Sequence, residues 1–123
     1  MVKLVESTHA SAALVGEECN FYSRETIKIA PNTTFEACTV LGKLTAGGAY
    51  TGLAPGAADG SQTPVAVAIY GISTGASGGE IAAWVRGPVS LRLSDIVWSQ
   101  PGITDTQKTA ALTALEALGF VFR

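Results

Sequence analysis

The most suggestive chemical motif in the sequence is GISTG at residues 71–75, which matches the G-x-S-x-G pattern of a nucleophile elbow. In that fold the serine leads into a helix, and an acidic residue and then a histidine follow it in the chain. Here the next residues, ASGGEIAAWV, are typical of a glycine turn and a strand, and no histidine lies beyond Ser73. The single histidine, His9, lies near the start of the chain. A hydrolase using Ser73 is therefore a weaker hypothesis than a hairpin turn shaped by these glycines.

Residues 39–50, TVLGKLTAGGAY, contain the ingredients of a phosphate-binding loop. A Walker A loop requires G-x-x-x-x-G-K-[ST], because its amides and lysine surround the phosphates while the hydroxyl holds magnesium. In this sequence Leu44 follows Lys43, and Ala37 occupies the position of the first glycine. The segment is therefore predicted to form a strand, a Gly-Gly turn and a returning strand, with Lys43 solvated on a strand face.

Metal ligands and acid–base groups are sparse. One histidine and two cysteines, Cys19 and Cys38, cannot complete the four ligands of a zinc site without carboxylates. In the absence of an export signal, reduced and packed thiols are favoured over a disulfide. The carboxylates are interpreted as solvated or helix-capping groups: Glu17, Glu18, Asp95 and Asp105. We therefore expect no catalytic site, no cofactor, no metal and no enzymatic activity.

Length and composition predict one domain with an unusual surface. The chain has 123 residues, and only 15% of them are charged, against about 25% in an average globular protein. Part of the surface is therefore expected to be covered by another chain. The 8 Lys+Arg and 10 Asp+Glu residues form no run of one sign, which argues against a nucleic-acid partner.

Targeting and membrane signals are weak. The longest apolar run, residues 65–70, has the length of a strand rather than of a membrane span. Polar residues 6–9 interrupt the apolar stretch that a signal peptide would need. We therefore expect a soluble protein that is made in a cytoplasm.

The chain divides into three parts. Residues 1–24 show no sustained helical or strand period and are predicted to form a flexible N-terminal arm that a partner orders. Residues 25–93 alternate short apolar stretches with turn residues, which indicates a β domain. The expected strands are 26–29, 39–45, 49–53, 65–70, 80–86 and 89–93, with loops at 54–64 and 71–79. Trp84 and Trp98 are interpreted as core residues rather than as ligand-stacking residues.

One C-terminal helix is predicted at about residues 104–118. Thr104 is a good N-cap, and Gln107 completes the pattern of a capping box. Gly119 suits the left-handed position after the helix. An apolar stripe at helical spacing consists of Ala111, Leu112, Leu115 and Leu118. The final residues 120–122 are expected to add a last strand or to plug the core.

The order of these segments resembles the phage head decoration proteins, the family of the lambda capsid-stabilising protein. The resemblance covers residues 25–123. It is carried by TVLGKLT at residues 39–45, DGSQT at 59–63, WVRGPV at 84–89, and a Trp-x-x-Pro-Gly-Ile turn at 98–103 before the helix. It implies a small, mostly β domain of the β-clip type with a C-terminal helix, a non-enzymatic role and a homotrimeric assembly.

The resemblance also implies a location and a partner. Such trimers sit on the outside of the expanded capsid, bind the major capsid protein and stabilise the virion head against the pressure of packaged DNA, without nucleic acid or membrane partners. The arm then orders on the shell by pairing with a capsid strand. Candidate capsid-binding residues are Val2, Lys3, Leu4, Val5, Ala13, Leu14, Val15, Phe21 and Tyr22. The alternative is a small β binding module on a phage tail or other structural assembly.

Overall fold

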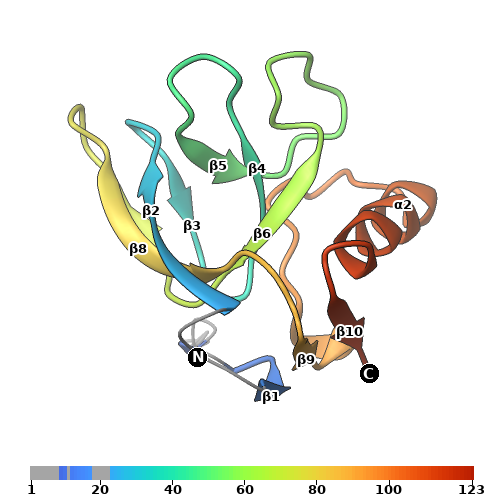
Figure 1. Ribbon diagram of the computed structural model, residues 1–123. Coiled ribbons are helices and arrows are strands. Elements are labelled where there is room, and N and C mark those ends of the chain that lie inside the picture. Colours follow the sequence, from blue (N-terminus) through green and yellow to red (C-terminus); the bar gives the residue numbers. More distant parts are fainter. Residues whose placement is uncertain (1–8, 11, 18–22) are drawn as a thin grey trace, which may run out of the picture.

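The computed structural model describes residues 9–10, 12–17 and 23–123. This part of the chain is mostly β with one α-helix near its C-terminal end (Figure 1), which confirms the predicted fold class. The strands are β1 (Leu14–Glu17), β2 (Arg24–Ile29), β3 (Thr34–Phe35), β4 (Val40–Lys43), β5 (Tyr50–Gly52), β6 (Pro64–Ala68), β7 (Ile72–Ser73), β8 (Gly79–Trp84), β9 (Val89–Leu91) and β10 (Phe120–Phe122). The helices are the 3-10 turn η1 (Leu93–Asp95) and α2 (Asp105–Glu116).

The centre of the fold is a closed barrel in the strand order β2-β5-β4-β6-β8. Its longest ladder joins β2 and β8 in antiparallel register from Arg24↔Trp84 to Ile29↔Gly79. The barrel closes where Ile29 pairs with Tyr50 in parallel. Closure removes free strand edges from this part of the fold.

Two apolar cores share the barrel strands. The first joins β2, β4, β6 and β8 and includes Ile27, Leu41 and Ala66. The second packs the outer side of the barrel against α2, β9 and β10, and it includes the fully buried Trp84. Successive residues of β6 point to different cores, which explains why the whole strand is apolar. The predicted core position of Trp84 is confirmed, and Trp98 is half-buried against the second core.

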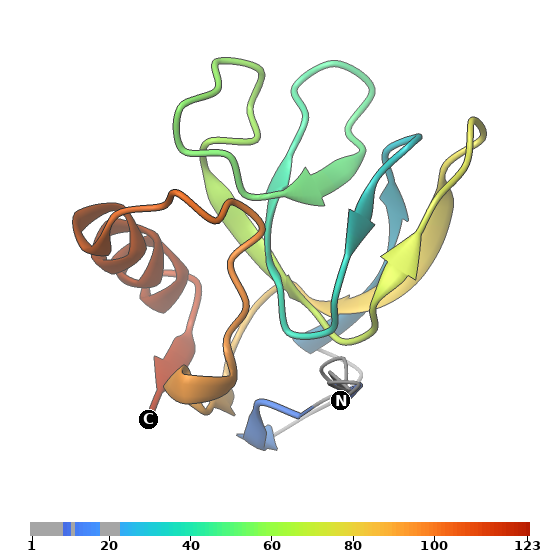
Figure 2. The same cartoon turned by 180° about the vertical axis from the view of Figure 1, so that it is seen from behind.

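A small three-stranded sheet, in the order β1-β9-β10, lies beside the barrel. It occupies one end of the molecule, away from the loops that join β4 to β5 and β5 to β6, in both views (Figures 1 and 2). Residues 120–122 form β10 and pair in parallel with β9, so the predicted last strand is confirmed. Phe120 from this strand is also buried, 2% exposed, in the second core.

The helix prediction is confirmed at its N-terminal cap and at the glycine that follows the helix, although the helix ends at Glu116. The side chain of Thr104 accepts a hydrogen bond from the Gln107 amide at 3.2 Å, and the Gln107 side chain accepts one from the Thr104 amide at 3.0 Å. Gly119 follows with φ of 98°. The predicted apolar stripe is wrong at Leu118, which is 40% exposed because the helix ends at Glu116 and the chain turns there.

The loop predicted at residues 71–79 is partly wrong. Ile72 and Ser73 form β7, which pairs antiparallel with β3 in a two-stranded ribbon. Strands of two residues are too short to produce an alternating pattern. The strand expected at 89–93 is also shorter, because η1 begins at Leu93.

The TVLGKLT and DGSQT segments pack against each other, which the sequence did not reveal. A Cβ atom added at Gly42 would lie 2.7 Å from the Cα of Ser61 and closer still to its carbonyl oxygen. Gly42 is therefore needed for close approach of two backbones. Gly47 and Gly48 have φ of 79° and 69°, as the predicted turn requires. Lys43 is exposed, as predicted, with its ammonium 5.5 Å from the centre of the Tyr50 ring.

Cys38 is a free, fully buried thiol, as the sequence predicted, while Cys19 lies outside the described residues. Burial raises the pKa of the Cys38 thiol, although the Ala13 amide opposes this by donating to its Sγ atom at 3.3 Å. The reactive thiolate is therefore scarce near pH 7.

This burial predicts slow alkylation of Cys38. In a Cys19→Ser variant, iodoacetamide at pH 7.5 is expected to modify the folded protein at least roughly 100-fold more slowly than the protein in urea, because the thiol is both shielded and protonated. Mass spectrometry of the product measures the rate. Similar rates in both states would show that Cys38 is accessible in the native protein.

Candidate functional site

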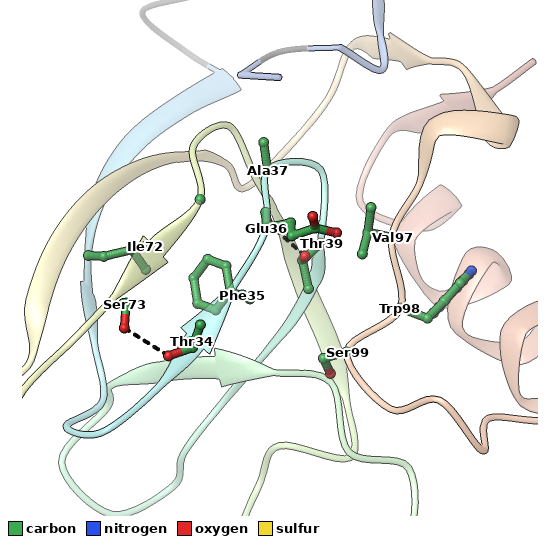
Figure 3. A pocket seen from close by; sticks show the side chains of 11 residues that line it. Thr34, Phe35, Glu36, Ala37, Thr39, Ile72, Ser73, Val97, Trp98 and Ser99 are labelled. Atoms are coloured by element: carbon green, nitrogen blue, oxygen red, sulfur yellow. Dashed lines mark hydrogen bonds between the residues drawn. The ribbon is translucent and has the colours of Figure 1, made fainter. Parts of the chain in front are cut away.

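A groove of about 580 Å³ lies between the β3–β7 ribbon and residues 97–99. Figure 3 shows Phe35 and Ile72 on the ribbon side and Val97 and Trp98 on the opposite side. Ser73, the serine of the GISTG motif, also lines this groove. The hydrolase hypothesis therefore depends on the groups that surround Ser73.

Ser73 lacks the surroundings of a nucleophile. Its hydroxyl lies 2.9 Å from the hydroxyl of Thr34, and neither group is a base (Figure 3). The titratable residue among those that line the groove is Glu36. After Ser73 the chain forms a bridge between Gly75 and Gly78 and continues into β8, not into a helix. The strand–turn–helix geometry of a nucleophile elbow is therefore not formed.

No three His, Cys, Asp or Glu residues in the described part of the chain are grouped so that they could hold a metal ion. None of the described helices has the length and apolar character needed to cross a bilayer.

The predicted capsid-binding residues fall into two groups. Those outside the described residues are Val2, Lys3, Leu4, Val5, Phe21 and Tyr22. The other three, Ala13, Leu14 and Val15, lie at or in β1. Ala13 is fully buried, Leu14 is half-buried against the second core, and Val15 is 50% exposed. Of these three, Val15 alone offers a large part of its side chain to another molecule.

β1 is an edge strand, because the sheet order is β1-β9-β10. It pairs antiparallel with β9, from Leu14↔Leu91 to Glu17↔Val89, and its register shifts between Leu14 and Gly16. Such an irregularity twists a strand and makes its edge a poorer template for a further strand.

Ala13 anchors the start of β1. Its amide donates to Cys38 Sγ, and its carbonyl accepts a 2.6 Å hydrogen bond from the Arg92 amide. Residues 12–17, which we call the arm root, are thus part of the folded body, contrary to the expectation of no strand in residues 1–24. A four-residue strand with a glycine and a register shift gives almost no periodic signal in the sequence.

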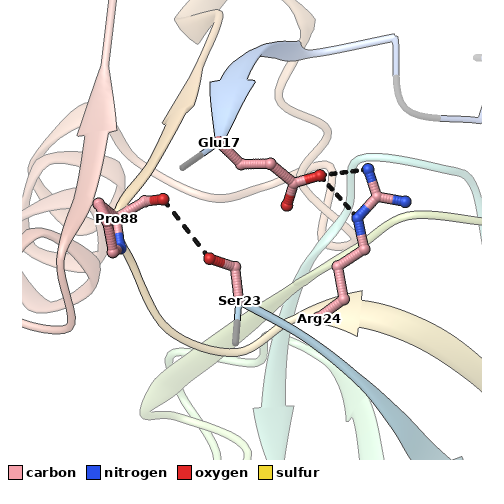
Figure 4. A network of polar contacts seen from close by, with 4 residues as sticks. All are labelled: Glu17, Ser23, Arg24 and Pro88. Atoms are coloured by element: carbon pink, nitrogen blue, oxygen red, sulfur yellow. Dashed lines mark hydrogen bonds and ion pairs between the residues drawn. The ribbon is translucent and has the colours of Figure 1, made fainter. Parts of the chain in front are cut away.

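Glu17 differs from its predicted solvated state. Its side chain is 9% exposed and forms an ion pair with Arg24, the first residue of β2. Glu17 Oε1 accepts hydrogen bonds from Nε of Arg24, at 2.8 Å, and from its terminal nitrogen (Figure 4). The hydrogen bond that Arg24 donates to Glu17 is the largest cause that raises the pKa of Arg24.

The neighbouring polar contacts join the same region to β9. Buried Ser23 donates from its hydroxyl to the Pro88 carbonyl at 3.4 Å (Figure 4). Its own carbonyl accepts from the Val85 amide at 2.9 Å. Two other carboxylates agree with their interpretation: Asp95 pairs with Arg92 at 3.2 Å at the surface, and Asp105 lies in the first turn of α2. Glu18 lies outside the described residues.

The comparison with protein families gives one result that covers nearly the whole chain. The family described as bacteriophage lambda head decoration protein D matches residues 3–120. No curated protein sequence matches this chain significantly. The family match includes the arm root, the barrel, α2 and the first residue of β10. The chain therefore belongs to the bacteriophage lambda head decoration protein D family and is a structural protein of the phage head.

Proposed function

We propose that this chain binds as a homotrimer to the outer surface of the expanded phage head and holds neighbouring major capsid proteins together against the pressure of packaged DNA. The observation that carries the proposal is the family match over residues 3–120. This match favours the head over the alternative of a phage tail. The β-clip type, the trimer and the absence of a nucleic-acid partner are parts of the same proposal.

The contact with the capsid is assigned to the arm and to the sheet that carries it. Residues 1–11, which we call the outer arm, add a strand to the capsid protein by main-chain hydrogen bonds. The adjoining sheet end supplies apolar contact area, since Val15, Leu93 and Val121 are 50%, 46% and 46% exposed. They belong to β1, η1 and β10.

A trimer multiplies weak contacts. One outer arm buries little surface, but three arms on one rigid body act as linked sites, and avidity can exceed the affinity of one arm by about 10² to 10⁴. A structural role of this kind needs surface area and valency, and no catalytic group.

Light scattering and co-sedimentation test the proposal. The purified protein is expected to have three times the mass of the 12.6 kDa chain at micromolar concentration, and to sediment with expanded heads that lack their decoration protein. Unexpanded heads provide the control and are expected to bind much less. A stable monomer would overturn the trimer, and equal binding to both kinds of head would overturn the requirement for expansion.

A further inference from the structure

The Glu17–Arg24 ion pair connects two elements that have no strand pairing with each other. Glu17 ends β1 in the three-stranded sheet, and Arg24 begins β2 in the barrel. The residues between them, 18–22, lie outside the described part of the chain. Within the described part, the side-chain contact between these two residues ties the arm root directly to the barrel (Figure 4).

The pair is more protected than the other ion pairs of the described chain. The side chains of Glu17 and Arg24 are 9% and 32% exposed, against 54% and 38% for Glu25 and Arg86. Exposed pairs contribute little because water screens them. A shielded pair in which one carboxylate oxygen accepts two hydrogen bonds is held much more firmly.

The two partners are not equivalent. Glu17 Oε2 is buried and has no hydrogen-bond partner among the described residues, so within this part of the chain the carboxylate depends on Arg24 for its compensation. Removing Arg24 would leave a shielded, uncompensated negative charge, whereas removing the charge of Glu17 would leave a guanidinium that water reaches. The loss of Arg24 is therefore the more damaging change.

We propose that the Glu17–Arg24 pair is a positioning element that fixes the arm root, residues 12–17, on the barrel and thereby sets the place from which the outer arm reaches the capsid. This inference rests on the proposed function. A fixed root means that residues 12–17 are already ordered, so their ordering adds no entropy cost when the outer arm binds. Release of the pair leaves the barrel folded but weakens attachment to the head.

Amide hydrogen exchange in the free protein tests the first half of the inference. Two amides report on the root. The Ala13 amide donates to Cys38 Sγ, and the Arg92 amide donates to the Ala13 carbonyl. The Arg123 amide, which donates to Leu91 in the same sheet, is the internal control. Glu17→Gln is expected to speed exchange at the two reporters roughly tenfold, and Arg24→Met more than that, with no change at Arg123.

The variants carry their own controls. The double variant Glu17→Gln with Arg24→Met is expected to exchange more slowly than Arg24→Met alone, because it leaves no stranded carboxylate. Glu25→Gln removes the exposed pair beside it and is expected to change exchange by less than about twofold. Unchanged exchange at Ala13 and Arg92 in both single variants would overturn the positioning role.

Co-sedimentation with expanded heads tests the second half. Glu17→Gln is expected to weaken binding roughly tenfold while circular dichroism and the trimer mass stay unchanged. Faster exchange with unchanged head binding would overturn the role of the pair in attachment. If the unmodified protein does not bind heads, the proposed function and the attachment role both fail, whereas the exchange measurement still decides whether the pair fixes the root.

Discussion

Removing residues 1–11 is expected to abolish binding to expanded heads and to leave the melting temperature within about 2 °C of the full-length value, whereas removing residues 1–17 is expected to lower it by about 10 °C. The difference arises because the second truncation also removes the arm root. Removal of residues 1–11 therefore tests binding to the head without a change in the stability of the fold.

The cost of the longer truncation follows from the contacts of the arm root. It removes the fully buried Ala13, the half-buried Leu14, and both hydrogen bonds of the Ala13 backbone. It also leaves β9 without its antiparallel neighbour and Arg24 without Glu17. Together these losses amount to about 3 kcal/mol, which corresponds to about 10 °C for a domain of this size.

Differential scanning calorimetry and co-sedimentation check both truncations. A chain lacking residues 1–17 that melts with the full-length protein would show that β1 contributes nothing to the body. A chain lacking residues 1–11 that still binds heads would place the capsid contact in the body instead of the outer arm.

Gly87→Ala is expected to destabilise the fold by about 3 kcal/mol, at the upper end for an overpacked site. A Cβ atom at Gly87 would lie 2.6 Å from the Cα of Gly119 and nearer still to its carbonyl oxygen. These are backbone atoms, which cannot rotate away as a side chain can. The Gly87 amide also donates to the Leu118 carbonyl at 2.8 Å, so the substitution disturbs the end of α2 and the start of β10.

Gly102→Ala is the matched control. It lies in the exposed turn before α2, and a Cβ atom there would meet no other atom within 4 Å. Its stability is expected to stay within about 0.5 kcal/mol of the original. Thermal melting of both variants measures the difference, and a Gly87→Ala protein as stable as Gly102→Ala would disprove the close packing of the two backbones.

The sequence predicted those elements whose pattern is local. The capping box at Thr104 and Gln107, the Gly47–Gly48 turn and the apolar strand before Tyr70 each depend on residues a few positions apart, and each is present. The closed barrel was not predicted, because pairings such as Arg24↔Trp84 join residues far apart in the chain. Periodicity carries no information on which strands become neighbours.

The candidate site was predicted less well. The arm root was missed because β1 is short and irregular, and Glu17 was interpreted as solvated because its partner Arg24 lies on another element. Three of the motifs that supported the family resemblance, at residues 39–45, 59–63 and 84–89, contain positions where two backbones lie in close contact. Only the structure reveals these contacts. Gly42 with Ser61, and Gly87 with Gly119, are contacts between segments that the sequence presents separately.

A cryo-electron microscopy map of expanded heads incubated with this protein tests the central claim most directly. The proposal predicts trimeric density on the outer surface, with the β1-β9-β10 end of each subunit facing the shell and the outer arm continuing a capsid strand. Heads whose outer surface remains bare, or density confined to the tail, would contradict it.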